Sequence, residues 1–340
     1  MLLKQLSEAF GVSGAEDEVR NILKKELQPF GIIKTDSLGN LFVFKSNLLE
    51  KPRIMLCAHM DEVGLMIKSI DKNGLLKFYT VGGIDERILV SKRVVIGSKK
   101  VKGVIGAKAI HLQEPNERKV PLRSKNLYID IGAKDKDEAS KFVNIGDYAL
   151  FDTSYKELSN NVIVGKAFDD RIGCYVIAEI LKRRYMVSVT GVFTVQEEIG
   201  LRGSATAAYS IYPDLAIVID GTFASDVPDT KEENYCTTLG QGPAITFMDM
   251  TYISQKKLFN RVISIAQRNE IPFQLKRTAS GGTDGGRIHI SCEGIPTIVI
   301  SVPCRYIHSP VSLANVEDIQ NTIRLVDAII IDFQERGFSV

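Results

Sequence analysis

The spacing of apolar residues over the first sixty positions changes from helical to strand-like. Ser13 followed three residues later by Glu16 predicts a capping box, after which apolar residues recur at helical spacing up to position 27. Gly39-Asn40 forms a turn signal before the strand-like run LFVFK, and the apolar run RIMLCAH at 53–59 is typical of a buried strand. This part of the chain therefore predicts a helix followed by two strands, as in an α/β domain.

From about residue 64 to residue 161 the pattern consists of short strand-like runs separated by turns. Asp71-Lys72-Asn73-Gly74 lies between two apolar runs and predicts a hairpin. One helix is expected, over residues 134–143. Closely spaced strands with turn signals predict a β-rich unit, either a small barrel or a sandwich.

After residue 161 strands and helices alternate again. Asn315 is expected to cap a long final helix with one apolar face. We interpret the chain as an α/β domain made of residues 1–64 and 162–340, interrupted by a β-rich, barrel-like insertion at 65–161. The strands expected in the second part lie at 162–165, 187–195, 215–220 and 295–302, and the helices at 170–182, 204–210 and 256–269.

Composition excludes several classes of protein. The chain has 340 residues, 44% of them apolar, and its 43 basic and 41 acidic residues give a net charge of +2. This balance gives no reason to expect nucleic acid or an anionic membrane as a partner. No apolar run approaches the roughly 20 residues of a spanning helix, and the start has no signal-peptide pattern. Five scattered cysteines, without a CxxC pair, favour reduced thiols in a cytoplasmic protein.

Acidic residues and histidines collect where five of the expected strands end. In open α/β sheets ligands bind beyond the carboxyl ends of strands. A single such acid is more often a helix cap, but five segments that include two of the four histidines are hard to explain by capping alone. Adjacent carboxylates also repel one another unless a cation lies nearby. The segments contain His59 with Asp61, Asp169 with Asp170, Glu197 with Glu198, Asp220, and His308.

This combination of groups predicts a pair of divalent metal ions. Imidazole and carboxylate ligands suit zinc, cobalt and manganese, and no cysteine is needed. Two ions roughly 3.5–4 Å apart would share one carboxylate and one water-derived ligand. The residues at the strand ends would supply two histidines, one bridging acid, two terminal acids and one remaining acid to act as general base.

Six motifs in this order resemble a known family. It is the cobalt- or zinc-dependent aminopeptidases that form tetrahedral dodecamers, which includes glutamyl aminopeptidase and deblocking aminopeptidases. The resemblance covers nearly the whole chain and implies a mixed-sheet, zinc-exopeptidase-like α/β/α domain interrupted by an insertion at the same place. The motifs are AHMDEVG, GKAFDDRIG, VQEEIGLRG, VIDGTFASDVPDT, SGGTDGGRIH and RYIHSPV.

The resemblance also implies a role for each residue of the site. His59 and Asp220 would hold one metal ion, and Glu198 and His308 would hold the other. Asp169 would bridge them, and its peptide bond to Asp170 would be cis. Glu197 would be the general base, and Asp61 would orient the imidazole of His59.

The activity implied is removal of N-terminal residues from peptides by a water that bridges the two metals, with Glu197 moving its proton. Two other activities remain open: an N-acyl amino-acid deacylase with the same metals, and an endoglucanase, as some relatives are labelled. The insertion is expected to drive self-association, either to a dimer or to a dodecamer. Asp284 in the glycine-rich GGTDGG segment either begins a helix or lies on the substrate side of the site.

Overall fold

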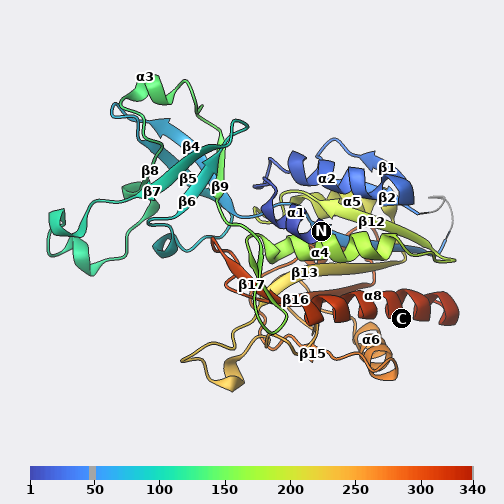
Figure 1. Ribbon diagram of the computed structural model, residues 1–340. Coiled ribbons are helices and arrows are strands. Elements are labelled where there is room, and N and C mark those ends of the chain that lie inside the picture. The colour runs from blue at the N-terminus through green and yellow to red at the C-terminus, as the bar shows by residue number, and fades with distance from the viewer. Residues whose placement is uncertain (46–50, 339–340) are drawn as a thin grey trace.

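The computed structural model describes residues 1–45 and 51–338. It contains a layered α/β body built on one large mixed sheet, with a closed barrel standing to one side of it (Figure 1). The predicted fold class, an α/β domain interrupted by a β-rich barrel, is therefore confirmed.

The central sheet brings the carboxyl ends of four parallel strands to the same edge. Strands β12, β3, β13 and β16 run parallel to one another in its centre. They are buried on both faces, which explains why they read as continuous apolar runs in the sequence. In spatial order the sheet contains β1 (Ile32–Thr35), β2 (Leu41–Phe44), β12 (Ser188–Thr194), β3 (Arg53–His59), β13 (Leu215–Phe223), β16 (Thr297–Arg305), β17 (Ser312–Asn315), β11 (Val162–Gly165) and β10 (Lys156–Glu157), with β14 (Ala244–Thr246) and β15 (Gln274–Leu275) attached beside β16.

Helices cover both faces of this sheet. One face packs against α1 (Leu2–Glu8), α2 (Asp17–Leu27), α4 (Phe168–Leu181), α6 (Lys256–Arg268) and α8 (Val316–Arg336). The other packs against α5 (Arg202–Ile211) and the short α7 (Gly285–Ile288). As predicted, Asn315 caps α8, because its Oδ1 accepts a hydrogen bond from the backbone N–H of Glu317 at 2.8 Å. Among the described residues, no helix has the length and apolar character needed to cross a bilayer.

The barrel has its own core. Its strands close in the order β4-β5-β8-β7-β6-β9, and β4 and β5 form the predicted hairpin. The helix expected over 134–143 is only the four-residue α3 (Lys136–Ala139). The division of the chain at 64/65 and 161/162 remains a prediction. The barrel strands are β4 (Gly64–Ile70), β5 (Leu76–Val81), β6 (Arg93–Ile96), β7 (Val101–Gly106), β8 (Tyr128–Asp130) and β9 (Tyr148–Phe151).

The described residues also include six short 3₁₀ helices. They lie in the connections between the longer elements, and three of them belong to the segment that projects from the barrel between β7 and β8. They are η1 (Gln28–Phe30), η2 (Glu86–Ile88), η3 (Ile110–Leu112), η4 (Glu117–Lys119), η5 (Ser124–Asn126) and η6 (Glu232–Asn234).

The predicted capping box at the start of α2 is wrong. The helix begins at Asp17, and no side chain caps it. The Ser13 hydroxyl instead donates to Asp61 Oδ2 at 2.6 Å, and Glu16 Oε1 accepts from the N–H groups of Gly14 and Gln196. Both side chains therefore serve contacts with distant parts of the chain, which local spacing cannot reveal.

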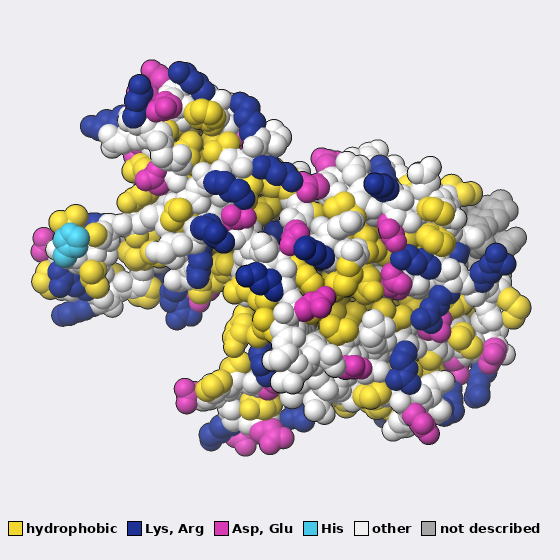
Figure 2. Space-filling view, viewed as in Figure 1, with side chains coloured by type: hydrophobic (Ala, Val, Ile, Leu, Met, Phe, Trp, Pro, Cys, Tyr) yellow, Lys and Arg dark blue, Asp and Glu magenta, His cyan; other side chains and the backbone are white. Residues whose placement is uncertain are grey.

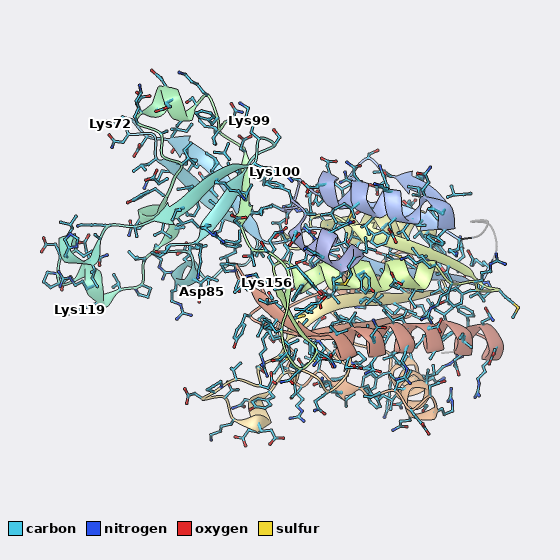
Figure 3. All side chains as sticks on the ribbon, viewed as in Figure 1. Lys72, Asp85, Lys99, Lys100, Lys119 and Lys156 are labelled. Carbon is cyan, nitrogen blue, oxygen red and sulfur yellow. The ribbon has the colours of Figure 1, made fainter. Side chains whose placement is uncertain are left out.

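Barrel and body meet along a small apolar cluster and a few polar contacts. Val12, which precedes α2, packs with Val95 of β6 and Leu150 of β9. Lys100, labelled in Figure 3, lies 3.0 Å from the Glu18 carboxylate on α2. The connection between the two parts is therefore held from several elements and does not depend only on the chain crossing between them.

Candidate metal centre

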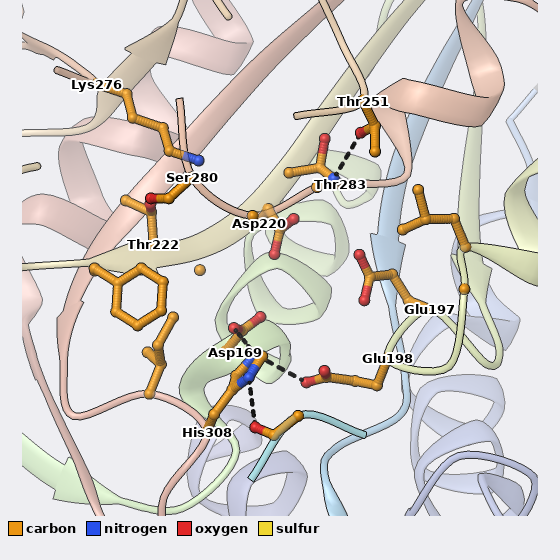
Figure 4. Close-up of a pocket in the computed structure, with 18 of the residues that line it drawn as sticks. Asp169, Glu197, Glu198, Asp220, Thr222, Thr251, Lys276, Ser280, Thr283 and His308 are labelled. Atoms are coloured by element: carbon orange, nitrogen blue, oxygen red, sulfur yellow. Dashed lines mark hydrogen bonds and ion pairs between the residues drawn. The ribbon is translucent and has the colours of Figure 1, made fainter. Parts of the chain in front are cut away.

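The residues proposed from the sequence meet beyond the carboxyl ends of the parallel strands (Figure 4). His59 is the last residue of β3, and its register partner in β12 is Thr194, three residues before Glu197. Asp220 lies in β13, the other neighbour of β3. Parallel pairing therefore brings His59 together with two segments that lie more than 130 residues later in the chain.

Asp169 lies between the two histidines. Its Oδ1 is 3.2 Å from His59 Nε2, and its Oδ2 is 3.3 Å from His308 Nε2. Asp220 Oδ1 lies 3.7 Å from His59 Nε2, and Glu198 Oε1 lies 3.4 Å from His308 Nε2. The site thus has two halves, each with one imidazole and one carboxylate, and Asp169 turns one oxygen toward each half.

Both imidazoles are oriented by backbone carbonyls. His59 Nδ1 lies 3.1 Å from the Asp61 carbonyl oxygen, and His308 Nδ1 lies 2.9 Å from the carbonyl oxygen of Gly83 in the barrel. Because a carbonyl only accepts hydrogen bonds, each Nδ1 carries the proton. In the neutral imidazole each Nε2 would then offer its lone pair on the side of Asp169, which is the arrangement that metal-binding histidines need.

The Asp61 carboxylate holds the loop after β12. It accepts hydrogen bonds from the backbone N–H groups of Glu197 at 3.0 Å and Glu198 at 3.1 Å, and from the Ser13 hydroxyl. Its Oδ1 is also 3.5 Å from His59 Nδ1. Asp61 therefore contacts the imidazole mainly through its backbone and fixes the two glutamates through its side chain.

The first turn of α4 departs from helical geometry at Asp169 and Asp170, whose side chains face in different directions. The peptide bond between them is cis, as expected, and the Asp170 side chain accepts from the N–H groups of His59 and Gly173. Asp170 is thus used within the protein, while Asp169 faces the site. A Cβ at position 221 would lie 2.9 Å from the Asp169 Cα, so glycine is required there.

Burial of several carboxylates makes the site electrostatically strained without a cation. Burial raises the pKa of Glu198 to about 8 and of Asp220 to about 7, and nearby carboxylates add to both shifts. Burial also raises the pKa of Glu197. The site contains two groups whose ligand atoms lie within 4.8 Å of one another, His59-Asp169-Glu198 and His59-Glu197-Asp220. Imidazole nitrogens and carboxylate oxygens at this spacing fit divalent metal ions, which would also neutralise the repulsion.

A pocket of about 450 Å³ opens beside these residues. It is also lined by residues to which the sequence analysis assigned no role, although four of them lie within the motifs VIDGTFASDVPDT and SGGTDGGRIH. Asp284 does not line it: it is buried behind the pocket, where its Oδ2 accepts from the Thr194 hydroxyl at 2.6 Å. The residues missed from the sequence are Thr222, Phe223, Thr251, Lys276, Ser280 and Arg287.

Two curated relatives are similar over nearly their full length. The lysyl aminopeptidase of Pyrococcus furiosus is 33% identical, covering 99% of this chain and 98% of the relative. The glutamyl aminopeptidase of Lactococcus lactis is 32% identical, covering 96% of this chain and 94% of the relative. Two relatives at nearly equal identity thus carry names that differ in the residue removed.

Solved structures agree with these relatives. A TET aminopeptidase from a marine sediment archaeon of the Thaumarchaeota superposes with a TM-score of 0.95 at 39% identity, covering 99% of this chain and 98% of that chain. The Pyrococcus horikoshii TET1 peptidase, which assembles into a tetrahedron or a large octahedral shell, gives 0.86 at 34% identity, covering 97% and 98%. A Thermotoga maritima protein described as an endoglucanase gives 0.81 at 40% identity, covering 96% of each chain.

A family model agrees with both comparisons. The model of the M42 glutamyl aminopeptidases matches residues 39–325, a range that contains every residue of the candidate metal centre. Together with the full-length relatives, this match shows a peptidase that hydrolyses peptide bonds. The chain belongs to the M42 glutamyl aminopeptidase family of peptidases.

Proposed function

We propose that this protein is a two-metal aminopeptidase that removes N-terminal residues from peptides. His59 and Asp220 would hold one ion, and Glu198 and His308 the other. Asp169 would lie between them. The observation that carries the proposal is the position of Asp169, whose two oxygens face the Nε2 atoms of two imidazoles, each oriented by a carbonyl at its Nδ1. Zinc or cobalt suits these ligands.

Glu197 is proposed as the general base. Its side chain is 8% exposed and lines the pocket, with Oε2 4.0 Å from His59 Nε2. Among the described residues, no donor hydrogen-bonds to its carboxylate, although Asp61 fixes its backbone. The carboxylate is therefore held at the site but remains able to accept a proton from a water and to return it to the leaving amine.

Divalent ions bound here would acidify a water, polarise the scissile carbonyl and anchor the free α-amine of the substrate. The surrounding chain positions the reacting groups. The segment containing Asp61 fixes the glutamate loop, and the buried carboxylate of Asp170 fixes the N–H of His59. Such preorganisation matters because general acid–base catalysis requires hydrogen-bond reach between base and water.

Neither alternative activity gains support from the arrangement. Glycoside hydrolysis uses two carboxyls on either side of the scissile bond, one of them an acid. Here the carboxylates gather around two histidines, as metal ligands do. A deacylase would have to recognise a substrate carboxylate in place of a free amine, and acetylated substrates test for it directly.

We also propose that the protein assembles through its insertion, as a dimer or as a dodecamer built from dimers. The segment between β7 and β8, residues 107–127, projects from the barrel and exposes several apolar side chains. Figure 2 shows hydrophobic side chains on this projecting segment. Ile110 is 69% exposed, Leu112 62% and Val120 63%. The five cysteines are free, which fits the proposed cytoplasmic location. Light scattering of the metal-loaded protein tests the assembly: a mass near 38 kDa would contradict it.

The test of the activity begins with metal removal. Protein treated with a chelator should lose hydrolysis of leucyl-p-nitroanilide and recover it when cobalt or zinc is added. His59→Ala should lose bound metal, measured by elemental analysis. N-acetyl-leucyl-p-nitroanilide should not be cleaved. Activity that survives chelation, or a preference for the acetylated substrate, would overturn the proposal.

A further inference from the structure

Asp284 is a buried carboxylate that the proposed mechanism does not use. It is 2% exposed, and among the described residues no lysine, arginine or histidine nitrogen lies within 4.0 Å of its carboxylate. Oδ2 accepts from the Thr194 hydroxyl at 2.6 Å and lies 3.6 Å from the thiol of Cys57, whereas the buried Oδ1 has no hydrogen-bond partner. The nearby Ser204 hydroxyl donates instead to the Leu201 carbonyl at 3.3 Å. Burying a carboxylate in this way costs free energy, so stability alone does not explain the residue.

The hydrogen bond from Thr194 joins Asp284 to the strand that leads into the metal centre. Thr194 is the last residue of β12 and the register partner of His59 in β3, and it lies three residues before Glu197. Both Thr194 and Asp284 are buried. Asp284 therefore attaches its own segment to the sheet at the point where a proposed metal ligand and the proposed base leave it.

The segment GGTDGG, residues 281–286, supplies one wall of the pocket. Residues 281–283 line the pocket, and so does Thr251. The Thr283 hydroxyl donates to Asp249 Oδ2 at 3.2 Å, and the N–H of Thr283 donates to the Thr251 hydroxyl at 3.4 Å (Figure 4). The Thr251 hydroxyl in turn donates to Asp249 Oδ1 at 2.9 Å. The wall is thus one hydrogen-bonded unit made from two loops.

Glycines allow the two loops of this wall to pack closely. A Cβ at position 282 would lie 2.8 Å from Thr251 Cγ2, and one at position 286 would lie 2.3 Å from Thr251 Oγ1. Among the described residues, the only side-chain hydrogen bonds from 281–286 to the parallel strands of the sheet are those of Asp284. The Asp284 side chain is therefore the polar link between the wall and the strands that carry the metal centre.

We propose that Asp284 is a positioning residue that, through Thr194, holds the pocket wall at a fixed distance from the metal centre and Glu197. This inference rests on the proposed aminopeptidase function, in which the α-amine and the scissile carbonyl of the substrate lie at the metal centre. The side chain of the first residue then contacts the wall, so the position of the wall decides how the carbonyl meets the base. A misplacement of about 1 Å can lower a rate by about 10²-fold.

A substrate without a side chain distinguishes this role from a general structural one. Leucyl-, lysyl- and glutamyl-p-nitroanilide have side chains that reach the wall, whereas glycyl-p-nitroanilide has none. The measured quantity is kcat/KM for whichever of the three the metal-loaded wild-type enzyme cleaves best, divided by kcat/KM for the glycyl substrate. Loss of folded protein or of metal lowers both values by the same factor and leaves their ratio unchanged.

Substitutions at both ends of the hydrogen bond then test the proposal. Thr194→Val removes the donor and keeps the size of the side chain, and we expect the ratio to fall by about 10–100-fold, the range for a hydrogen bond to a charged group. Thr194→Ser retains the hydroxyl and should keep the wild-type ratio. Asp284→Asn presents a neutral acceptor and should lower the ratio by a smaller factor, which measures the effect even if Thr194→Val does not fold.

Thr322→Val is the matched control. Thr322 is a buried threonine of α8 whose hydroxyl donates to the Asp318 carbonyl at 2.7 Å, and it does not line the pocket. Its substitution should keep the wild-type ratio. Melting temperature and metal content are measured for every variant.

The outcomes separate this inference from the function on which it rests. A wild-type enzyme that cleaves the glycyl substrate as fast as the other three, or a ratio that is unchanged in Thr194→Val and Asp284→Asn, overturns the inference alone. Loss of metal from Thr194→Val at an unchanged ratio also overturns it, because the residue would then support His59 and not the wall. A metal-loaded wild-type enzyme that cleaves none of the four nitroanilides would overturn the proposed function itself.

Discussion

The barrel and the α/β body differ most in what they bury. Residues 64–151, all of them described, bury no polar or charged side chain, and their core consists of residues such as Leu76, Ile105 and Ile129. The body buries many, including Asp61, Asp170, Arg171, Asp284 and Asp318. A buried polar group costs free energy unless it is paired, and a buried charge costs more.

This difference separates stability from function within one chain. The barrel consists of a closed sheet around an apolar core, and the burial of that core stabilises it. The body holds its charges through specific long-range partners, as when Arg171 donates to the carbonyl oxygens of Met60, Leu6 and Gly11. Substitutions in the two parts should therefore change different measured quantities.

The largest expected effect is on catalysis in the body. Glu197→Gln should lower kcat by about 10²–10⁴, because the amide cannot accept the proton from water. Metal content and melting temperature should stay at wild-type values, since Asp61 accepts from the backbone N–H of residue 197 and not from its side chain. Steady-state kinetics with elemental analysis checks this, and full activity in the variant would remove Glu197 from its role.

The barrel should respond in the opposite way. Ile129→Ala removes a fully buried side chain that lies between Leu76 and Ile105 in the barrel, and should destabilise the protein by about 2–5 kcal/mol. Activity per folded subunit should change little. Val104→Ala, on the neighbouring strand and 46% exposed, is the control and should have a small effect in urea unfolding. A large loss of kcat in Ile129→Ala with unchanged stability would contradict the view that the barrel core contributes to stability and not to catalysis.

A third prediction concerns pH. Burial raises the pKa of Asp318 in α8 to about 6, although its carboxylate accepts from the N–H groups of Gly240 and Gly242. The folded state then binds a proton more tightly than the unfolded state, where the pKa is about 3.9. The contribution of this group to stability is complete below pH 4 and is lost as the pH rises through 6, by at most about 3 kcal/mol.

The measurement compares urea unfolding at pH 5 and pH 8. Asp318→Asn should show a smaller loss of unfolding free energy over this range than the wild type. Because the barrel buries no ionisable group, Ile129→Ala should keep the wild-type pH dependence. Equal pH dependence in Asp318→Asn and wild type would contradict the assignment.

The smallest expected effect is at Asp61. Asp61→Asn keeps the size of the side chain and its backbone contact with His59, but presents an N–H₂ group to one of the two glutamate N–H groups. We expect metal affinity and activity to fall by about 10–100-fold, as for other residues that support metal ligands. Metal titration checks it, with Ser13→Ala as the milder change that removes only one donor to Asp61.

The sequence predicted the parts of this fold that depend on local pattern. Buried parallel strands, the hairpin at 71–74 and the cap at Asn315 each follow from spacing or a short motif. The candidate ligands could be found because strand ends converge in such sheets, and because six motifs resemble one family. Lys276 could not be found, because a lysine between Leu275 and Arg277 gives no sign that it will be buried facing a pocket.

The wrong capping box shows that a local motif can also predict a contact that does not form. Ser13 and Glu16 have the local spacing of a cap, but the acceptor of Ser13 lies 48 residues away, and Glu16 accepts from Gln196, 180 residues away, as well as from the nearby Gly14. Local propensity is a weak preference, and contacts with the distant residues Asp61 and Gln196 override it. The short α3 and the unexpected helix α1 reflect the same dependence on tertiary packing.

The carbonyl oxygen of Gly83 links the barrel to the candidate metal centre. It belongs to the barrel, and it orients the imidazole of His308 in the body. If metal binds as proposed, the position of the barrel affects the affinity of His308 for the ion. Because such coupling is reciprocal, bound metal then stabilises this position of the barrel by the same free energy. If subunits contact one another through their barrels, their association would therefore depend on the concentration of free metal ion.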